Sequence, residues 1–245
     1  MKSVLITGAN KSIGYETARQ LLNKGYHIYL GSRNLKNGLE AAEKLKAEGF
    51  SKVEAIQIDV NSTESVKAAR VEIGKRTGVL DVLINNAAIN GGIPQSPIET
   101  DISVFKNVFE TNLFGVVRVT QAFIDLLQKS PEPRIVNVTS GMGSLTMHSD
   151  PTWDSYHYKA VVYDTSKAAL NMYTIQLAYE LRDTPFRVNA VDPGFTKTDF
   201  NNHRGTGTVE LAASRLIKCV LINNDGPTGK YFSDQNNPET GESLW

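Results

Sequence analysis

The fold is decided by residues 2–14, Lys2-Ser3-Val4-Leu5-Ile6-Thr7-Gly8-Ala9-Asn10-Lys11-Ser12-Ile13-Gly14. A short apolar run ends in glycine and passes directly into a helical pattern. Glycines at a strand-to-helix turn let the backbone approach a pyrophosphate, and the helix N-terminus adds amide donors and a positive dipole. The spacing is T-G-x-x-x-S-x-G, with Ser12 where glycine is expected. Such a turn can also be purely structural, but its place after the first strand favours a nucleotide site.

The rest of the chain repeats this alternation of short apolar runs and helical patterns. The runs carry β-branched and apolar residues on consecutive positions, as strands buried on both faces of a parallel sheet do. Expected strands are Val4–Thr7, His27–Gly31, Val53–Ile58, Val79–Asn85, Arg134–Thr139, Arg187–Val191 and, more weakly, Lys230–Phe232. Expected helices are Ile13–Lys24, Leu35–Glu48, Ser62–Lys75, Ile102–Gln128, Ser166–Arg182 and Val209–Leu221.

This order predicts an α/β, Rossmann-type doubly wound fold with a parallel sheet of about seven strands flanked by helices. No linker, repeat or low-complexity block divides the chain, so we expect residues 1–245 to form a single domain.

Composition excludes several classes of function. The 245 residues are 40% hydrophobic and 21% charged, and 26 basic residues balance 26 acidic ones. No basic surface therefore argues for nucleic acid or an anionic membrane. The single cysteine, Cys219, cannot form an internal disulfide, and no metal site is expected. Without an 18-residue apolar run or a signal-peptide core, the expected location is the cytoplasm.

The end of the second predicted strand indicates which dinucleotide is bound. An acidic residue there would hydrogen-bond the ribose hydroxyls of NAD. The chain instead has Ser32-Arg33-Asn34, and Lys11 lies in the glycine-rich turn. Two cations and no carboxylate favour the 2′-phosphate of NADP, although each cation could also be an ordinary surface group.

Tyr163 and Lys167 are four residues apart, which on a helix places both side chains on one face. A free tyrosine has a pKa near ~10, and a nearby cation lowers it by roughly 1–3 units. The pair could therefore exchange a proton near neutral pH. The alternative is a half-exposed helix with a tyrosine on its apolar side.

Taken together, these motifs resemble the short-chain dehydrogenase/reductase family in its short, single-domain form. The chain is most similar to the NADP-dependent carbonyl reductases, through Asn10-Lys11 and Ser32-Arg33. The resemblance runs from Lys2 to the C-terminus. The motifs, in family order, are Thr7-Gly8…Gly14, Asp59-Val60, Asn85-Asn86-Ala87, Asn112, Ser140, Tyr163…Lys167 and Pro193-Gly194…Thr198. The chain has Ala88 where the family usually has glycine.

The resemblance implies a catalytic set of Asn112, Ser140, Tyr163 and Lys167. Tyr163 would exchange the proton, Lys167 would lower its pKa and bind the nicotinamide ribose, Ser140 would stabilise the substrate oxygen, and Asn112 would join a proton relay. The residues implied to bind cofactor are Gly8, Asn10, Lys11, Ser12, Ile13, Gly14, Arg33, Asp59, Val60, Asn86, Ala87, Tyr163, Lys167, Pro193, Gly194 and Thr198. Asp59 could instead cap the next helix, Asn112 could be a plain polar helix residue, and Ser140 could be a turn former.

The implied function is reduction of a ketone or aldehyde by NADPH, or the reverse oxidation. An NADP-sensing regulatory protein on the same fold is the main alternative, but it has no use for an intact catalytic set. A nucleotide-sugar epimerase normally carries a larger C-terminal region, and a methyltransferase would leave the Tyr–Lys pair unexplained.

Ser140 and Tyr163 are 23 positions apart, markedly more than is usual in the family. The intervening segment, 141–160, is rich in methionine and aromatic residues, which suit a wall for an apolar or aromatic substrate or a local minicore. Carbonyl reductases with a long insertion here can be monomers, so a monomer is narrowly favoured over a homo-oligomer. Residues Asp199 to Thr208 have no apolar periodicity and are expected to form a mobile lid, or else an ordinary surface loop.

Overall fold

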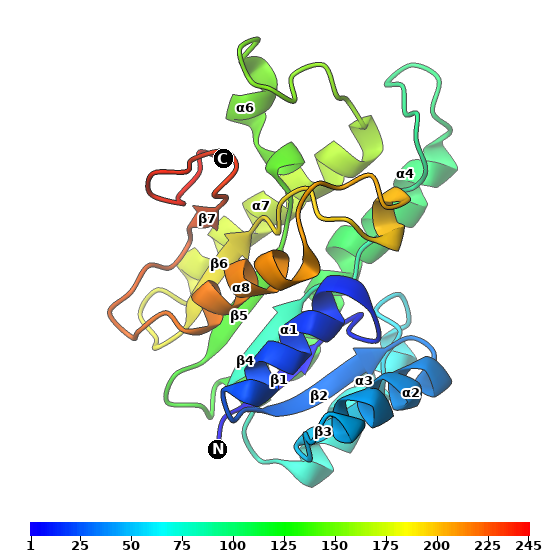
Figure 1. Ribbon diagram of the computed structural model, residues 1–245. Helices are drawn as coiled ribbons and strands as arrows, with labels where there is room; N and C mark the ends of the chain where they lie inside the picture. The colour runs from blue at the N-terminus through cyan, green and yellow to red at the C-terminus, as the bar shows by residue number, and fades with distance from the viewer.

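The computed structural model describes all 245 residues and contains one seven-stranded sheet (Figure 1). The strands are β1 (Ser3–Ile6), β2 (His27–Ser32), β3 (Val53–Gln57), β4 (Val82–Asn85), β5 (Arg134–Val138), β6 (Arg187–Val191) and β7 (Tyr231–Phe232). The helices are α1 (Ser12–Asn23), α2 (Leu35–Ala47), α3 (Thr63–Arg76), α4 (Ile102–Phe109), α5 (Gly115–Leu127), α6 (Leu145–Ser149), α7 (Val161–Glu180) and α8 (Val209–Val220).

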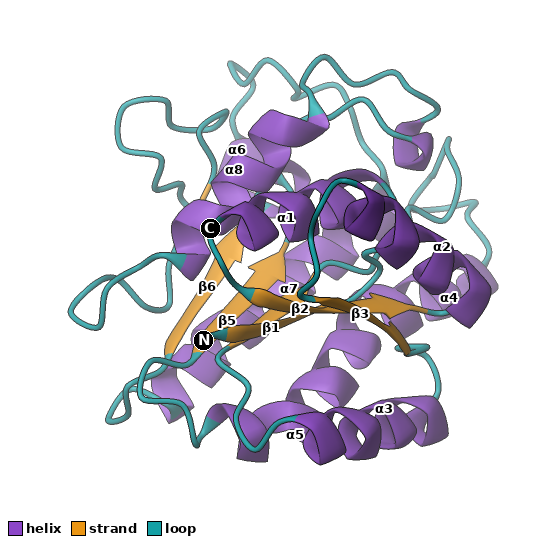
Figure 2. Ribbon diagram, turned by 60° about the horizontal axis from the view of Figure 1, so that its bottom comes forward, coloured by secondary structure: helices purple, strands orange, loops and turns teal.

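All neighbouring strands pair in parallel, in the order β3-β2-β1-β4-β5-β6-β7. The order reverses between β1 and β4, and helices cover both faces of the sheet (Figure 2). The predicted doubly wound α/β fold is therefore confirmed. In such a sheet the ligand crevice forms at the carboxyl ends of the strands, where the strand order reverses.

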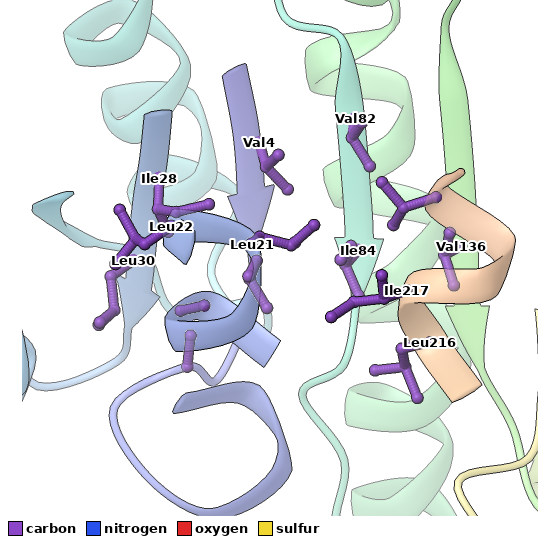
Figure 3. Packing of buried hydrophobic residues seen from close by; sticks show 14 of the residues in the cluster. Val4, Leu21, Leu22, Ile28, Leu30, Val82, Ile84, Val136, Leu216 and Ile217 are labelled. Carbon is purple, nitrogen blue, oxygen red and sulfur yellow. The ribbon is translucent and has the colours of Figure 1, made fainter. Parts of the chain in front are cut away.

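Two separate apolar layers hold the helices on the sheet. Val4 and Ile6 of β1 point to the face covered by α1, α2 and α8, whereas Leu5 points to the face covered by α3, α5 and the end of α7. Figure 3 shows the first layer, in which side chains of α1 and α8 pack on β1, β2, β4 and β5. Complete burial of such a side chain stabilises the fold by about 1.5–3 kcal/mol.

The predicted helix Ile102–Gln128 is present but is not regular. It consists of α4, a π-helical segment η1 (Glu110–Phe114) and α5. Asn112 lies inside the π-helical segment. π-Helical turns inside α-helices occur frequently at functional sites.

Two predicted boundaries were wrong by several residues. Helix α7 begins at Val161 and not at Ser166, so Tyr163 lies in its first turn. Strand β4 begins at Val82 and not at Val79, because the Leu80 amide donates to the Leu126 carbonyl and not to a neighbouring strand. None of the helices combines the length and the apolar composition needed to cross a membrane.

Candidate active site

The turn between β1 and α1 is tightly packed against the end of β4. Gly8 has a φ of +63°, and a Cβ at Gly14 would lie 2.7 Å from the Asn86 Nδ2 and 2.8 Å from the Gly8 carbonyl oxygen. Ser12 also has a positive φ, +52°, which explains physically why glycine is expected at this position. The turn therefore presents backbone atoms to the crevice without side chains in between.

The N-terminus of α1 has no side-chain cap. Its N-cap residue, Lys11, makes no capping hydrogen bond, and the first turn contains no acidic residue. The first amides of a helix lack partners within the helix, and they attract anions. The chemistry of this turn therefore fits a pyrophosphate, and the same turn holds Asn10 and Ile13.

Asn86 and Ala87 hold the glycine turn in place. The Asn86 Nδ2 donates to the carbonyl oxygens of Thr7, at 2.9 Å, and Gly8, at 3.1 Å. The Thr7 hydroxyl accepts from the amides of Asn86, at 3.0 Å, and Ala87, at 3.1 Å. These contacts are architectural and fix the floor of the crevice.

Asp59 and Val60 follow β3 at the same edge of the sheet. Helix α3 is capped by Ser62, whose hydroxyl accepts from the Ser65 amide at 3.2 Å, so Asp59 does not serve as the cap. One oxygen of Asp59 accepts from the Asn61 amide at 3.1 Å. The alternative role of Asp59 as a helix cap is therefore not observed.

Arg33 and Lys11, the two cations expected near the 2′-phosphate, have different surroundings. Arg33 is exposed beyond the end of β2. The Lys11 ammonium forms a 2.8 Å ion pair with Asp199, at the start of the expected lid. Both partners are more than half exposed, and such surface pairs contribute little stability. Lys11 thus links the glycine turn to the lid.

Ser140, Tyr163 and Lys167 come together where β5 meets the first turns of α7. The Ser140 side chain lies next to the Tyr163 phenol and affects its pKa. The Lys167 Nζ lies 5.7 Å from the centre of the Tyr163 ring and donates to the Val138 carbonyl oxygen at 2.8 Å. The lysine side chain is only 2% exposed. A partly buried phenol and hydroxyl and a buried ammonium therefore share one site.

Burial dominates the electrostatics of this site. It raises the pKa of Tyr163, while the neighbouring Ser140 side chain acts in the opposite direction. Burial also lowers the pKa of Lys167 to about 7, and the nearby Asp192 carboxylate partly offsets this shift. The direction for the tyrosine is opposite to the predicted one, because loss of water disfavours the phenolate.

Asn112 is fully buried and its side chain is fully hydrogen-bonded. Its Nδ2 donates to the Ile89 carbonyl oxygen at 2.9 Å and to the Ser166 hydroxyl at 3.0 Å, and its Oδ1 accepts from the Ile89 amide at 2.9 Å. Ser166 in turn donates to the Tyr163 carbonyl oxygen at 2.7 Å. The asparagine therefore connects the loop after β4 to the helix that carries Tyr163.

The Pro193-Gly194 turn follows β6 at the same edge. Gly194 has a φ of +81°, and its amide donates to Asp192 at 2.9 Å. Arg215 of α8 donates to the Pro193 carbonyl oxygen at 2.7 Å. Thr198, a few residues further on, is buried. The turn is thus held from both sides before the chain enters the 199–208 segment.

The 199–208 segment lies over Tyr163. It begins with a short 3-10 helix, η3 (Asp199–Asn201), and the Phe200 ring lies 5.5 Å from the Tyr163 ring at an interplanar angle of 60°. The Asn90 side chain donates to the Phe200 carbonyl oxygen. A cavity of about 470 Å³ separates residues 90–93 from residues 199–204. This location agrees with a lid; its mobility stays a prediction.

The 141–160 segment makes local contacts and also reaches the C-terminus, where Ser144 and Thr146 donate to the carbonyl oxygens of residues 244 and 245. It contains a 3-10 turn, η2 (Gly141–Gly143), and α6. His148 packs edge-on against Trp153, with 5.2 Å between ring centres, and Tyr156 packs similarly against His157, at 5.3 Å. Burial lowers the pKa of His148. These contacts match the minicore alternative for this part of the segment.

Several residues around Ser140, Tyr163 and Lys167 were not predicted from the sequence. Asp192 lies beside Lys167, Phe200 covers Tyr163, and Tyr231 donates its hydroxyl to the Ser140 carbonyl oxygen at 2.9 Å. Each comes from a segment far along the chain. Only Asp192 had a sequence signal, because it directly precedes the Pro193-Gly194 pair.

Comparisons with known proteins identify relatives over nearly the whole chain. A family model described as short chain dehydrogenase matches residues 2–208. The (+)-neomenthol dehydrogenase of Capsicum annuum is 33% identical, with 93% of this chain and 94% of the relative covered. The structure of salutaridine reductase from Papaver somniferum matches with a TM-score of 0.83 and 29% identity, covering 96% of this chain and 100% of that one. An NADPH-bound carbonyl reductase from chicken fatty liver matches with a TM-score of 0.85 and 27% identity, covering 100% and 99%.

Proposed function

The chain belongs to the short-chain dehydrogenase family, and on this premise we propose that it reduces a ketone or aldehyde with NADPH through Ser140, Tyr163 and Lys167. It is an oxidoreductase that acts on a carbonyl or alcohol group. The observation that carries the assignment is the Tyr163 phenol, which lies next to the Ser140 side chain and beside the buried Lys167 ammonium. The same chemistry run backwards would oxidise an alcohol.

The proposed cofactor is NADP(H). The Gly8–Gly14 turn and the uncapped N-terminus of α1 suit the pyrophosphate, and Asp59 and Val60, which follow β3 at the same edge of the sheet, would contact the adenine. The NADPH bound to the chicken carbonyl reductase and the cations Lys11 and Arg33 support the phosphorylated dinucleotide. When bound, NADPH supplies the hydride that the reduction requires.

Each catalytic residue has a distinct role in the proposal. Tyr163 donates its phenol proton to the substrate oxygen as negative charge develops there, and Ser140 donates a hydrogen bond to the same oxygen. A donor of this kind contributes about 3 kcal/mol to transition-state stabilisation in other enzymes. Lys167 supplies positive charge beside the phenol and binds the nicotinamide ribose hydroxyls. Asn112 would maintain the proton relay behind the lysine.

A regulatory NADP sensor is the competing function. It would need the crevice but not the proton donor, the ammonium and the hydroxyl in one site. The relatives reported above are named as a dehydrogenase and reductases, which supports the enzyme.

The deciding experiment replaces the proton donor. Tyr163→Phe should lower kcat at least about a hundredfold, as loss of a positioned general acid does, while the Kd for NADPH stays close to wild type. Tyr179→Phe makes the same chemical change on an exposed face of the same helix and should leave both constants unchanged. Full activity of Tyr163→Phe would overturn the catalytic assignment. NADPH binding by a wild-type protein that turns over no carbonyl compound would favour the sensor.

For the substrate we propose an apolar or aromatic carbonyl compound. Phe200 and Ile93 line the cavity beside Tyr163, and Tyr158 and Phe195 are partly exposed in the segments that border the site. NADPH oxidation measured with cyclic ketones, aromatic aldehydes and quinones should exceed that measured with small polar ketones such as hydroxyacetone. A preference for the polar ketones would contradict this proposal.

A monomer and a cytoplasmic location complete the proposal. The monomer is supported by the long 141–160 segment, in which the Thr146 hydroxyl donates to the Trp245 carbonyl oxygen of the same chain at 2.8 Å. A light-scattering mass of one chain would support the monomer, and a mass of two or four chains would contradict it. Cell fractionation tests the location.

A further inference from the structure

The helix that carries Tyr163 begins without a cap of its own. Its N-cap residue is Ala160, which has no side-chain acceptor. The first hydrogen bond within the helix runs from the Asp164 amide to the Ala160 carbonyl oxygen at 2.8 Å. The amides of the first turn, including that of Tyr163 itself, must therefore find acceptors elsewhere.

The acceptor comes from Gln95, 68 residues earlier in the chain. Its Oε1 accepts from the amides of Val162, at 2.9 Å, and Tyr163, at 3.1 Å. Gln95 is 7% exposed and also forms an isolated parallel bridge with Ala160. It thus caps the catalytic helix from another part of the fold.

The other end of the same amide holds the loop beside the cavity. The Nε2 of Gln95 donates to the carbonyl oxygens of Asn90, at 2.6 Å, and Gly92, at 2.7 Å. The orientation of the amide is unambiguous, because two N–H groups face one end and two carbonyl groups face the other. All four hydrogen-bonding positions of the side chain are used.

The loop held by Gln95 also reaches the lid. Asn90 donates to the Phe200 carbonyl oxygen, and the Phe200 ring lies against Tyr163. The carbonyl oxygen of Tyr163 accepts from Ser166. The backbone of the proton donor is therefore held on its amide side by Gln95 and on its carbonyl side by Ser166.

We propose that Gln95 is a positioning residue for the reaction. Its hydrogen bonds connect the first turn of α7 to the 90–92 loop and thereby fix the position of the Tyr163 phenol. This inference rests on the proposed function. An amide is required because the side chain must accept two hydrogen bonds and donate two. A carboxylate could serve the helix but would repel the carbonyl oxygens, and an apolar side chain would remove the hydrogen-bond partner of four backbone groups, of which the Val162 amide is buried.

The first test replaces Gln95 with a residue of similar shape. Gln95→Met should lower kcat at least about tenfold, the factor that corresponds to loss of one good hydrogen bond, with KM and the Kd for NADPH within about threefold of wild type. Gln121→Met makes the same change at an exposed position of α5 and should leave all three constants unchanged. Wild-type kcat in a folded Gln95→Met protein would overturn the proposal.

The second test does not depend on turnover. Amide hydrogen exchange of the wild type and Gln95→Met should differ at Val162 and Tyr163 by about tenfold or more, with smaller changes at residues 90–93 and none in the distant strands β2 and β3. Uniformly faster exchange over the whole chain would show a merely structural role and overturn the proposal. If the wild type reduces no carbonyl compound, the proposed function fails, and the local exchange pattern still decides the role of Gln95.

The conservative variant Gln95→Glu keeps oxygen atoms that can accept from the amides of Val162 and Tyr163. It tests the positioning role if the methionine variant does not fold. A protonated carboxyl group has one donor and one acceptor end, so it partly reproduces the amide. The ratio of kcat for Gln95→Glu to kcat for wild type should rise as pH falls from 8 to 5.5. Wild type contains the same Asp164, whose pKa burial raises to about 6, so the ratio corrects for titration of that group. A ratio that is constant with pH would contradict the proposal.

Discussion

Replacement of Lys167 by methionine should make the protein more stable at neutral pH while it removes activity. The lysine side chain is 2% exposed, and its ammonium has a backbone carbonyl oxygen as its hydrogen-bond acceptor. A buried ammonium without a paired carboxylate costs folding free energy. Methionine has a similar length and no charge, so it fills the same space without that cost.

The size of the effect follows from the pKa of Lys167, which is about 7 in the folded protein against 10.5 for a free side chain. This difference corresponds to roughly 5 kcal/mol at low pH. Methionine leaves the Val138 carbonyl oxygen unpaired, at a cost of about 1–3 kcal/mol, and removes positive charge near Asp192. We therefore expect Lys167→Met to be about 2 kcal/mol more stable than wild type at pH 7.

The pH dependence separates this explanation from general repacking. The folded pKa lies below the unfolded one, so the unfolded wild type binds the additional proton between about pH 7 and 10.5, and wild-type stability rises across this window. The advantage of the methionine variant should shrink by about 2 kcal/mol between pH 7 and 9.

Equilibrium unfolding in urea without added cofactor, followed by tryptophan fluorescence at pH 6, 7, 8 and 9, measures the difference. Lys106→Met, at an exposed position of α4, is the matched control, and its difference from wild type should not vary between pH 7 and 9. A stability difference for Lys167→Met that stays constant from pH 6 to 9 would refute the reasoning, because it would mean that the buried lysine keeps an ordinary pKa.

Two further predictions concern the cofactor crevice. Arg33→Ala and Lys11→Ala should each weaken NADPH binding about tenfold or more but hardly affect NADH binding, since only NADPH has a 2′-phosphate that a cation can bind. Fluorescence titration with each cofactor gives both Kd values, and equal losses of affinity for NADPH and NADH would contradict the assignment. Gly14→Ala should lower stability by about 1–3 kcal/mol, because the added Cβ would lie 2.8 Å from the Gly8 carbonyl oxygen, whereas Gly78→Ala, with nothing within 4 Å of its Cβ, should be neutral in the same thermal melts.

The sheet was predictable because its strands are buried on both faces. Burial of this kind puts apolar residues on consecutive positions, as in Val4-Leu5-Ile6, and the pattern is visible without any knowledge of the partners. The alternation of strands and helices indicated a parallel sheet, since parallel neighbours need crossover helices. The strands and the doubly wound class were therefore contained in the local sequence, whereas the order β3-β2-β1-β4-β5-β6-β7 came from the structure.

The start of α7 was not predictable in the same way. Ala160 offers no capping side chain, and Val161 and Val162 are β-branched, so local signals favoured a later start. The acceptor that stabilises this turn is Gln95, which nothing in the sequence connects with residue 163. Helix boundaries that depend on a cap from a distant segment are determined by tertiary structure.

Distant segments also determine the pKa values of Tyr163 and Lys167, which could not be predicted from the sequence. The four-residue spacing of Tyr163 and Lys167 is local, whereas their burial depends on Phe200, Val138 and Asp192, which come from three other segments. Burial acts oppositely on an acid and a base, so it raises the pKa of the phenol and lowers that of the ammonium. The phenol consequently keeps its proton at neutral pH, which is the form needed to reduce a carbonyl group. The protonation states of this pair are therefore determined by segments that lie far apart in the sequence, and the four-residue spacing alone cannot give them.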